Sequence, residues 1–159
     1  MGSGMPIGCV FGKAEVMDAA APGTIGGTYI GNPVACAASL ATIQYMKDID
    51  LNNKAKKVGQ TFMSRFEEMK GKYREIGDVR GLGAMIAMEF VKDGDPQQAD
   101  PDFCSKVVQA CSKRDLIVIS AGVHKSVLRI LSPLTISEDM LNKGLTIIEE
   151  EIARLSLSK

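Results

Sequence analysis

The stretch GTIGGTYIGNPVACAASLA, from Gly23 to Ala41, joins a glycine-rich loop to the start of a helix. Asn32 is a favourable N-cap, and Pro33 takes the first helical position, where a missing N–H costs nothing. Most residues from 35 to 41 are small and allow this helix to pack closely against another backbone. Two interpretations of the loop stay open: a tight structural turn, or a backbone cradle for an anion.

The anion hypothesis rests on three features of this loop. Gly26 and Gly27 permit backbone conformations closed to other residues and let the chain approach a ligand closely. The following helix N-terminus offers N–H groups and a partial positive charge. Thr28 adds a hydroxyl donor, and Tyr29 either packs on a ligand or covers the helix start. A glycine loop by itself does not decide between a turn and a phosphate site.

The rest of the chain predicts an α+β layer. The segment MPIGCVFGKAEVMDA predicts a strand with the turn that leaves it. Apolar residues at spacings of three and four predict a long amphipathic helix: Leu51, Ala55, Val58, Phe62, Phe66, Met69 and Tyr73. From Glu75 onward we expect strand, helix, strand, strand, helix, with EIGDVRGLGAMIAMEFV as the first strand and Ser137 capping the last helix. This order indicates a small sheet with helices on one face.

The composition is that of a globular domain, and its net charge gives no indication of a highly charged partner. Apolar residues make up 45% of the 159 residues, charged residues 24%, and the net charge is zero. Neither nucleic acid nor a membrane is therefore expected as a partner, and the chain is expected in the cytoplasm. Four cysteines without paired short spacing and a single histidine make a metal site or a disulfide framework improbable, so Cys104 and Cys111 are expected as buried thiols.

Arg129 is the candidate for binding a carboxylate. In the predicted strand SVLRIL its side chain shares a face with Val127 and Leu131, and a charge among apolar neighbours is costly unless it is paired. The alternative is an edge-strand arginine that reaches solvent or an internal ion pair. Arg80, in a turn, is expected to pair with a backbone carbonyl or a nearby acid. The run of glutamates at 149–151 is expected to be a solvated helix face.

Taken in order, these segments resemble the C-terminal part of the class III (ω-amino acid) aminotransferases, which use pyridoxal phosphate. GMPIGCVFGKAEVMDA resembles the segment that follows the family's catalytic lysine, and GGTYIGNPVACAASLA matches its Gly-Thr-x-x-Gly-Asn-Pro-x-Ala-Cys-Ala-Ala motif. DVRGLGAMIAMEF and VLRILSPLTISEDMLNKGL match two further segments. Within the family the chain is most similar to members that act on 4-aminobutyrate, and the acetylornithine and ornithine enzymes share much of the pattern.

The resemblance implies a fold, a cofactor and site residues. The fold is the C-terminal part of a fold-type I transferase, with residues 1–45 as the remnant of the large domain and 46–159 as the small α+β domain. In a homodimer, Thr28, together with Gly27, would reach the phosphate of pyridoxal phosphate held by the partner subunit. Arg129 would bind the α-carboxylate of the amino acid or of 2-oxoglutarate.

One departure from the family affects the expected activity of this chain. The family's Schiff-base lysine lies upstream of the Gly-Met-Pro segment, and Lys13 does not match that position. We therefore expect a C-terminal fragment that is inactive alone, whose parent would convert 4-aminobutyrate and 2-oxoglutarate to succinate semialdehyde and glutamate. The competing hypothesis is a non-catalytic α+β module that binds a ligand or a partner.

Overall fold

The computed structural model describes residues 1–157 and divides the chain into two compact units. The N-terminal unit is Met1–Leu51, and the C-terminal unit runs from Asn52 onward. The boundary expected at residues 45 and 46 stays a prediction about the parent fold.

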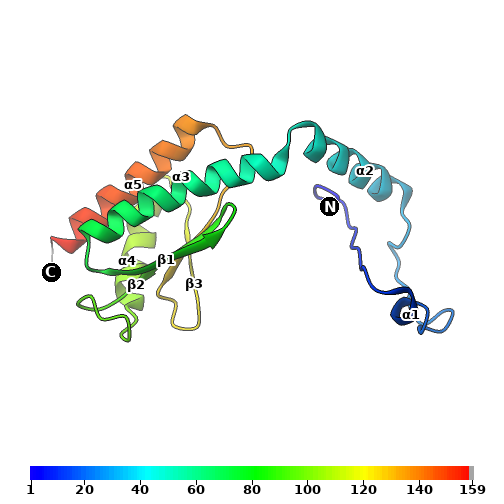
Figure 1. Ribbon diagram of the computed structural model, residues 1–159, viewed down its shortest axis with the longest axis horizontal. Coiled ribbons are helices and arrows are strands. Elements are labelled where there is room, and N and C mark those ends of the chain that lie inside the picture. Colours follow the sequence, from blue (N-terminus) through cyan, green and yellow to red (C-terminus); the bar gives the residue numbers. More distant parts are fainter. Residues whose placement is uncertain (158–159) are drawn as a thin grey trace. The chain divides into compact units, whose positions relative to one another are not determined.

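The N-terminal unit contains two helices, α1 (Ala14–Met17) and α2 (Pro33–Asp48) (Figure 1). Helix α2 starts as predicted, because the Asn32 side chain accepts hydrogen bonds from the N–H groups of Val34 and Ala35 at 3.0 and 3.1 Å. The Ser3 and Thr42 hydroxyls, 3.0 Å apart, tie the start of the chain to this helix.

The strand expected within MPIGCVFGKAEVMDA is wrong for the described structure, since this segment has no strand and ends in α1. A strand needs a neighbouring strand to pair its backbone and to bury its apolar side chains. Val10 and Phe11 are 76% and 89% exposed, so the segment has found neither.

The C-terminal unit is a four-stranded antiparallel sheet with three helices. Its elements along the chain are α3 (Leu51–Lys72, whose first residue belongs to the N-terminal unit), β1 (Ile76–Leu82), β2 (Met85–Phe90), α4 (Pro101–Ser112), β3 (Ile119–Ala121), β4 (Val127–Leu131) and α5 (Glu138–Ser156). The strand order in the sheet is β1-β2-β4-β3. The predicted helices and the two short strands after α4 are confirmed.

The segment predicted as one strand from Glu75 is a hairpin of two. Strands β1 and β2 are joined by a two-residue turn, in which Gly83 has a φ of +56° that suits glycine. The register shifts between Ile76 and Asp78, so β1 lacks the strict alternation that marks β2. This irregularity hid the additional strand from pattern analysis.

All three helices cover the same face of the sheet, as the sequence predicted. The buried core joins Phe66 and Met69 of α3, Val107 of α4 and Leu145 of α5 to the inward side chains of the strands, Met88 among them. The opposite face of the sheet is open and carries exposed side chains. This open face holds Arg129.

Glutamates 149–151 do more than form a solvated face, so that expectation is wrong in part. Glu149 accepts bonds of 2.8 Å from both Arg65 and Lys72 of α3, which runs beside α5 (Figure 1). Glu151 is only 8% exposed and pairs with Arg114 and Arg154. The glutamates therefore link α5 to α3 and to the end of α4.

Candidate functional site

The glycine loop borders a hollow of about 450 Å³ within the N-terminal unit. Its lining residues come from two segments: Pro6–Gly8 and Gly27–Asn32, with Ala35 and Cys36 from α2. Among the described residues, no acidic side chain lines the hollow. Thr28 is exposed there and has no hydrogen-bond partner among residues 1–157.

The positive backbone φ angles of the loop occur at other glycines than the predicted Gly26 and Gly27. Positive φ angles occur at Gly23 (+83°) and Gly31 (+70°) and not at Gly26 or Gly27. A Cβ at Gly26 would meet nothing within 4 Å, and one at Gly27 would make only ordinary contacts with Ile30. Gly23 and Gly31 therefore shape the turns, whereas Gly26 and Gly27 leave the approach to the backbone open.

The N-terminus of α2 does not offer the free N–H groups that the anion hypothesis assumed. Asn32 occupies those of Val34 and Ala35 with its side chain, and its carbonyl accepts from Cys36. The N–H groups of Gly27 and Thr28 have no acceptor within the described chain. Any anion would therefore be held by the loop backbone and the Thr28 hydroxyl, with only the helix dipole behind them.

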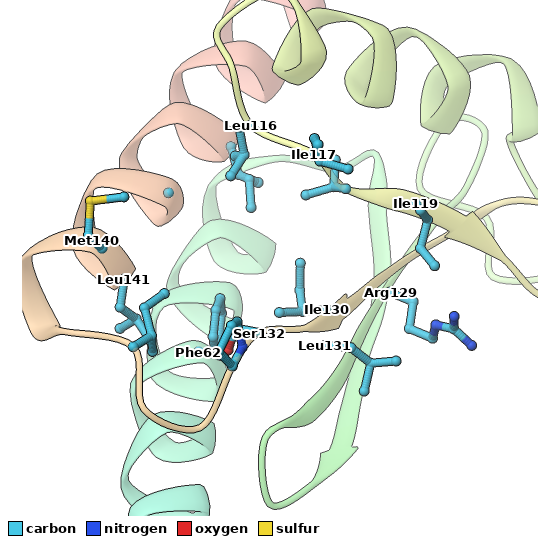
Figure 2. A pocket seen from close by; sticks show the side chains of 15 residues that line it. Phe62, Leu116, Ile117, Ile119, Arg129, Ile130, Leu131, Ser132, Met140 and Leu141 are labelled. Carbon is cyan, nitrogen blue, oxygen red and sulfur yellow. The ribbon is translucent and has the colours of Figure 1, made fainter. Parts of the chain in front are cut away.

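Arg129 lies on the open face of the sheet, in the central strand β4, so it is no edge-strand arginine. Figure 2 shows Arg129 and Leu131 on the side of β4 opposite Ile130, which points into the apolar hollow behind the strand. Arg129 is exposed, and no carboxylate pairs with it among the residues that the structure describes. Such a guanidinium is free to bind a carboxylate through two parallel N–H groups.

Arg80 shares this face and is paired with two acids. Its Nη1 lies 2.6 Å from Asp78 Oδ2 and 2.7 Å from Glu89 Oε2. The hydrogen bonds to Asp78 and then to Glu89 raise the pKa of the Arg80 guanidinium above its ordinary value. The predicted pairing with a nearby acid is confirmed. Ala87 on β2 pairs across the sheet with Arg80 of β1 on one side and with Arg129 of β4 on the other.

Sequence analysis missed an apolar hollow of about 380 Å³ in the C-terminal unit, between α3, α5 and β4 (Figure 2). Phe62, Leu116 and Met140 are among its lining side chains. The buried Ser132 Oγ, from a residue of the same lining, has no hydrogen-bond partner within residues 1–157. These side chains come from four distant segments, so no local pattern could have indicated the hollow.

The remaining titratable candidates stay outside both hollows. Burial raises the pKa of the Cys104 and Cys111 thiols to about 11, which confirms them as buried apolar groups. His124 is exposed in the turn before β4. Within residues 1–157 no three His, Cys, Asp or Glu side chains gather into a metal-binding group, and no helix is long and apolar enough to cross a bilayer.

Comparison with known proteins gives a consistent result. The family model described as aminotransferase class-III matches residues 1–152. The chain is 43% identical over 150 residues to a 5-aminovalerate aminotransferase of Pseudomonas aeruginosa, covering 94% of this chain and 35% of that protein. It is 45% identical over 147 residues to the 4-aminobutyrate aminotransferase of Escherichia coli, covering 92% of this chain and 34% of that protein.

A solved structure with the same fold is the ornithine aminotransferase of Toxoplasma gondii. The TM-score is 0.78 at 28% identity, with 93% of this chain and 33% of that chain covered. The fold is thus the α+β part of a pyridoxal-phosphate-dependent aminotransferase, as the resemblance implied. The chain belongs to the class III aminotransferase family, and it spans about a third of the length of the curated relatives it matches.

Proposed function

We propose that this chain is the C-terminal part of an aminotransferase that moves the amino group of 4-aminobutyrate to 2-oxoglutarate, forming succinate semialdehyde and glutamate. The observation that carries the proposal is the family match over residues 1–152, within which Thr28 and Arg129 are both exposed and unpaired among the described residues. Two of the similar enzymes are named for ω-amino acids, 4-aminobutyrate and 5-aminovalerate. The expected cytoplasmic location stays a prediction.

Arg129 would bind the α-carboxylate of glutamate and 2-oxoglutarate. Its guanidinium stands free on the open sheet face and offers the planar pair of N–H groups that fits a carboxylate. A well-formed charge-assisted hydrogen bond of this kind contributes about 1.5–3 kcal/mol. Anchoring the substrate here fixes its position relative to the reacting carbon.

Thr28 and Gly27 would hold the phosphate of pyridoxal phosphate bound by the partner subunit of a homodimer. The donor set of the loop suits a phosphate, since a hydroxyl and unpaired backbone N–H groups border a hollow without acidic side chains. When bound, the cofactor supplies the electron sink for amino-group transfer. The apolar side chains that the N-terminal unit exposes, Phe11 at 89% among them, support an assembly that covers them.

The 159-residue chain is proposed to be inactive alone. This proposal rests on the resemblance, because the family's Schiff-base lysine lies upstream of the segment that begins with Gly4-Met5-Pro6. Lys13, which lies within that segment, does not match the catalytic position.

A chimera tests the proposed activity. This chain replaces the matching C-terminal third of the Escherichia coli 4-aminobutyrate aminotransferase, and succinate semialdehyde formation is assayed with 4-aminobutyrate and 2-oxoglutarate. The active chimera is expected to lose most of its activity with Arg129→Gln or Thr28→Val and to keep it with the exposed control Arg74→Gln. Full activity of the Arg129→Gln chimera at low 2-oxoglutarate would contradict the role of Arg129.

The same chimera separates the alternatives. Faster turnover of ornithine or acetylornithine than of 4-aminobutyrate would favour an ornithine-type enzyme, which the structural similarity to an ornithine aminotransferase also fits. A folded chimera without activity on any of these amines would favour a non-catalytic module that binds a ligand or a partner.

A further inference from the structure

The Glu89 carboxylate lies between two arginines on the open face of the sheet. Glu89 is on β2, Arg80 on the neighbouring strand β1 and Arg129 on the other neighbour, β4. Both arginines pair across the strands with Ala87, two residues before Glu89 on the same face. Each arginine is therefore a diagonal neighbour of the same carboxylate.

Diagonal neighbours on one face of a sheet lie about 7–8 Å apart, which long side chains can span. Arg80 spans this distance, because its Nη1 lies 2.7 Å from Glu89 Oε2. Ser126 Oγ lies 3.5 Å from the other oxygen, Oε1. Arg129 occupies the equivalent diagonal on the opposite side and makes no such bond among the described residues.

A carboxylate that bonded Arg129 within the protein would compete with a carboxylate substrate for the same N–H groups. Glu89 is the acidic side chain placed to compete, because it is a diagonal neighbour of Arg129. Directly across from Glu89 lie Asp78 on β1 and the apolar Val127 on β4. Asp78 is itself bonded to Arg80 at 2.6 Å. Arg80 thus holds one oxygen of Glu89 on the β1 side of the sheet.

We propose that Arg80 is a positioning residue that holds Glu89 on the β1 side of the sheet and so keeps Arg129 free for the carboxylate of the substrate. The inference rests on the proposed role of Arg129 and adds a residue that never touches the substrate. Without Arg80, Glu89 turns to Arg129 and forms an internal ion pair. The substrate must then displace this pair before it can bind.

The experiment uses the 159-residue chain labelled with ¹⁵N and glutarate as the probe, a dicarboxylate as long as 2-oxoglutarate. The variants are Arg80→Gln, Glu89→Gln and the double variant. Arg74→Gln is the matched control, because Arg74 forms a similar exposed pair with Asp93 at 3.5 Å. The Arg129 Nε–H resonance is followed first without ligand and then during titration with glutarate.

Arg80→Gln is expected to shift the ligand-free Arg129 resonance and to weaken glutarate binding about two- to fivefold, the range that exposed ion pairs reach. Glu89→Gln alone changes the affinity less, because Arg80 already neutralises that carboxylate. In the double variant both the resonance and the affinity return to within about twofold of the unchanged chain, a coupling that independent sites would not show. Arg74→Gln leaves both unchanged.

Two results would overturn the inference. One is an Arg80→Gln chain whose Arg129 resonance and glutarate affinity match the unchanged protein. The other is a double variant that binds as weakly as Arg80→Gln, because the loss would then come from the missing Arg80 charge alone. If Arg129→Gln binds glutarate as well as the unchanged chain, the proposed role of Arg129 fails, and the ligand-free resonances still decide whether Arg80 restrains Glu89.

Discussion

The N-terminal and C-terminal units differ in how far each buries its own apolar residues. In the C-terminal unit, large side chains such as Phe66, Met88 and Leu145 are completely covered. In the N-terminal unit the buried residues are small: Gly2, Ala35 and Ser39. Phe11, Ile25 and other large apolar side chains of that unit are instead mostly exposed, at 89% and 72% for these two.

This difference separates a region with its own apolar core from one that leaves its large apolar side chains in water. The transfer of apolar surface out of water is the main driving force of folding, at about 25 cal/mol per Å². The C-terminal unit gains this stabilisation internally. The N-terminal unit carries the candidate phosphate loop on a scaffold that gains little of this stabilisation, so a partner that covered Phe11 and its neighbours would stabilise the loop.

Thiol labelling should show the largest contrast between the units. At pH 8, Cys9 is expected to react like a free thiol, whereas Cys104 and Cys111 are buried with pKa values of about 11. They react only through unfolding of the C-terminal unit, which slows labelling roughly a thousandfold or more for a domain of ordinary stability. Mass spectrometry after timed alkylation measures the rates, and equal rates for Cys9 and Cys104 would remove the contrast.

Truncating one phenylalanine in each unit sharpens the comparison. Phe66→Ala leaves a cavity in the core and should lower the free energy of unfolding of the C-terminal unit by about 3–5 kcal/mol. Phe11→Ala, at a site 89% exposed, should change the free energy of unfolding by less than about 0.5 kcal/mol. Urea denaturation followed by circular dichroism gives both values. A large effect of Phe11→Ala would mean that this side chain is covered in the isolated chain.

A smaller effect is expected where α3 packs on the β1–β2 turn. A Cβ at Gly59 would lie 1.8 Å from the carbonyl oxygen of Gly83, so Gly59→Ala should cost about 1–3 kcal/mol through forced separation. Gly71, on the same helix, has nothing within 4 Å of the added atom. Gly71→Ala should therefore stabilise the unit by about 0.5 kcal/mol through helix propensity. Thermal unfolding of the pair tests whether this contact or the helix itself sets the requirement for glycine.

The smallest effect concerns the ion pairs between α5 and α3. Bonds from Lys72 and then Arg65 hold the pKa of Glu149 below its usual value of 4.5, so the folded state binds the proton less readily than the unfolded state. This stabilisation is complete above about pH 4.5 and is lost as the pH falls through the lower folded-state pKa. Glu149→Gln should lower the free energy of unfolding at pH 7 by less than about 1 kcal/mol. In this variant the free energy of unfolding should also fall less steeply as the pH is lowered, which flattens the acid limb of the stability curve.

The exposed Glu67 provides the control for that measurement. It lies on α3 without an ion pair among residues 1–157, so Glu67→Gln should leave the acid limb of the stability curve unchanged. Equal flattening by both variants would show that the acid sensitivity reflects the total charge of the unit and not the bonds of Glu149.

Most helices and the open sheet face followed from local signals in the sequence. Asn32 and Ser137 cap their helices as the pattern predicted, and Arg80 pairs with acids. The strand proposed near Val10 failed because a strand forms only with a partner, which a local pattern does not contain. The use of the α2 N–H groups by Asn32 is a local consequence of that cap. The position of Glu89 between two arginines depends on pairing across segments, so the sequence alone did not reveal it.

The strand order β1-β2-β4-β3 also has a kinetic consequence. The β1–β2 hairpin closes over two residues, whereas β4 reaches β2 only after residues 91–126 have been brought round, α4 among them. Closing that long loop costs chain entropy before its contacts form, so joining β4 to β2 is expected to be the slow event in folding. The strand that presents Arg129 would then be among the last to reach its place as the chain folds.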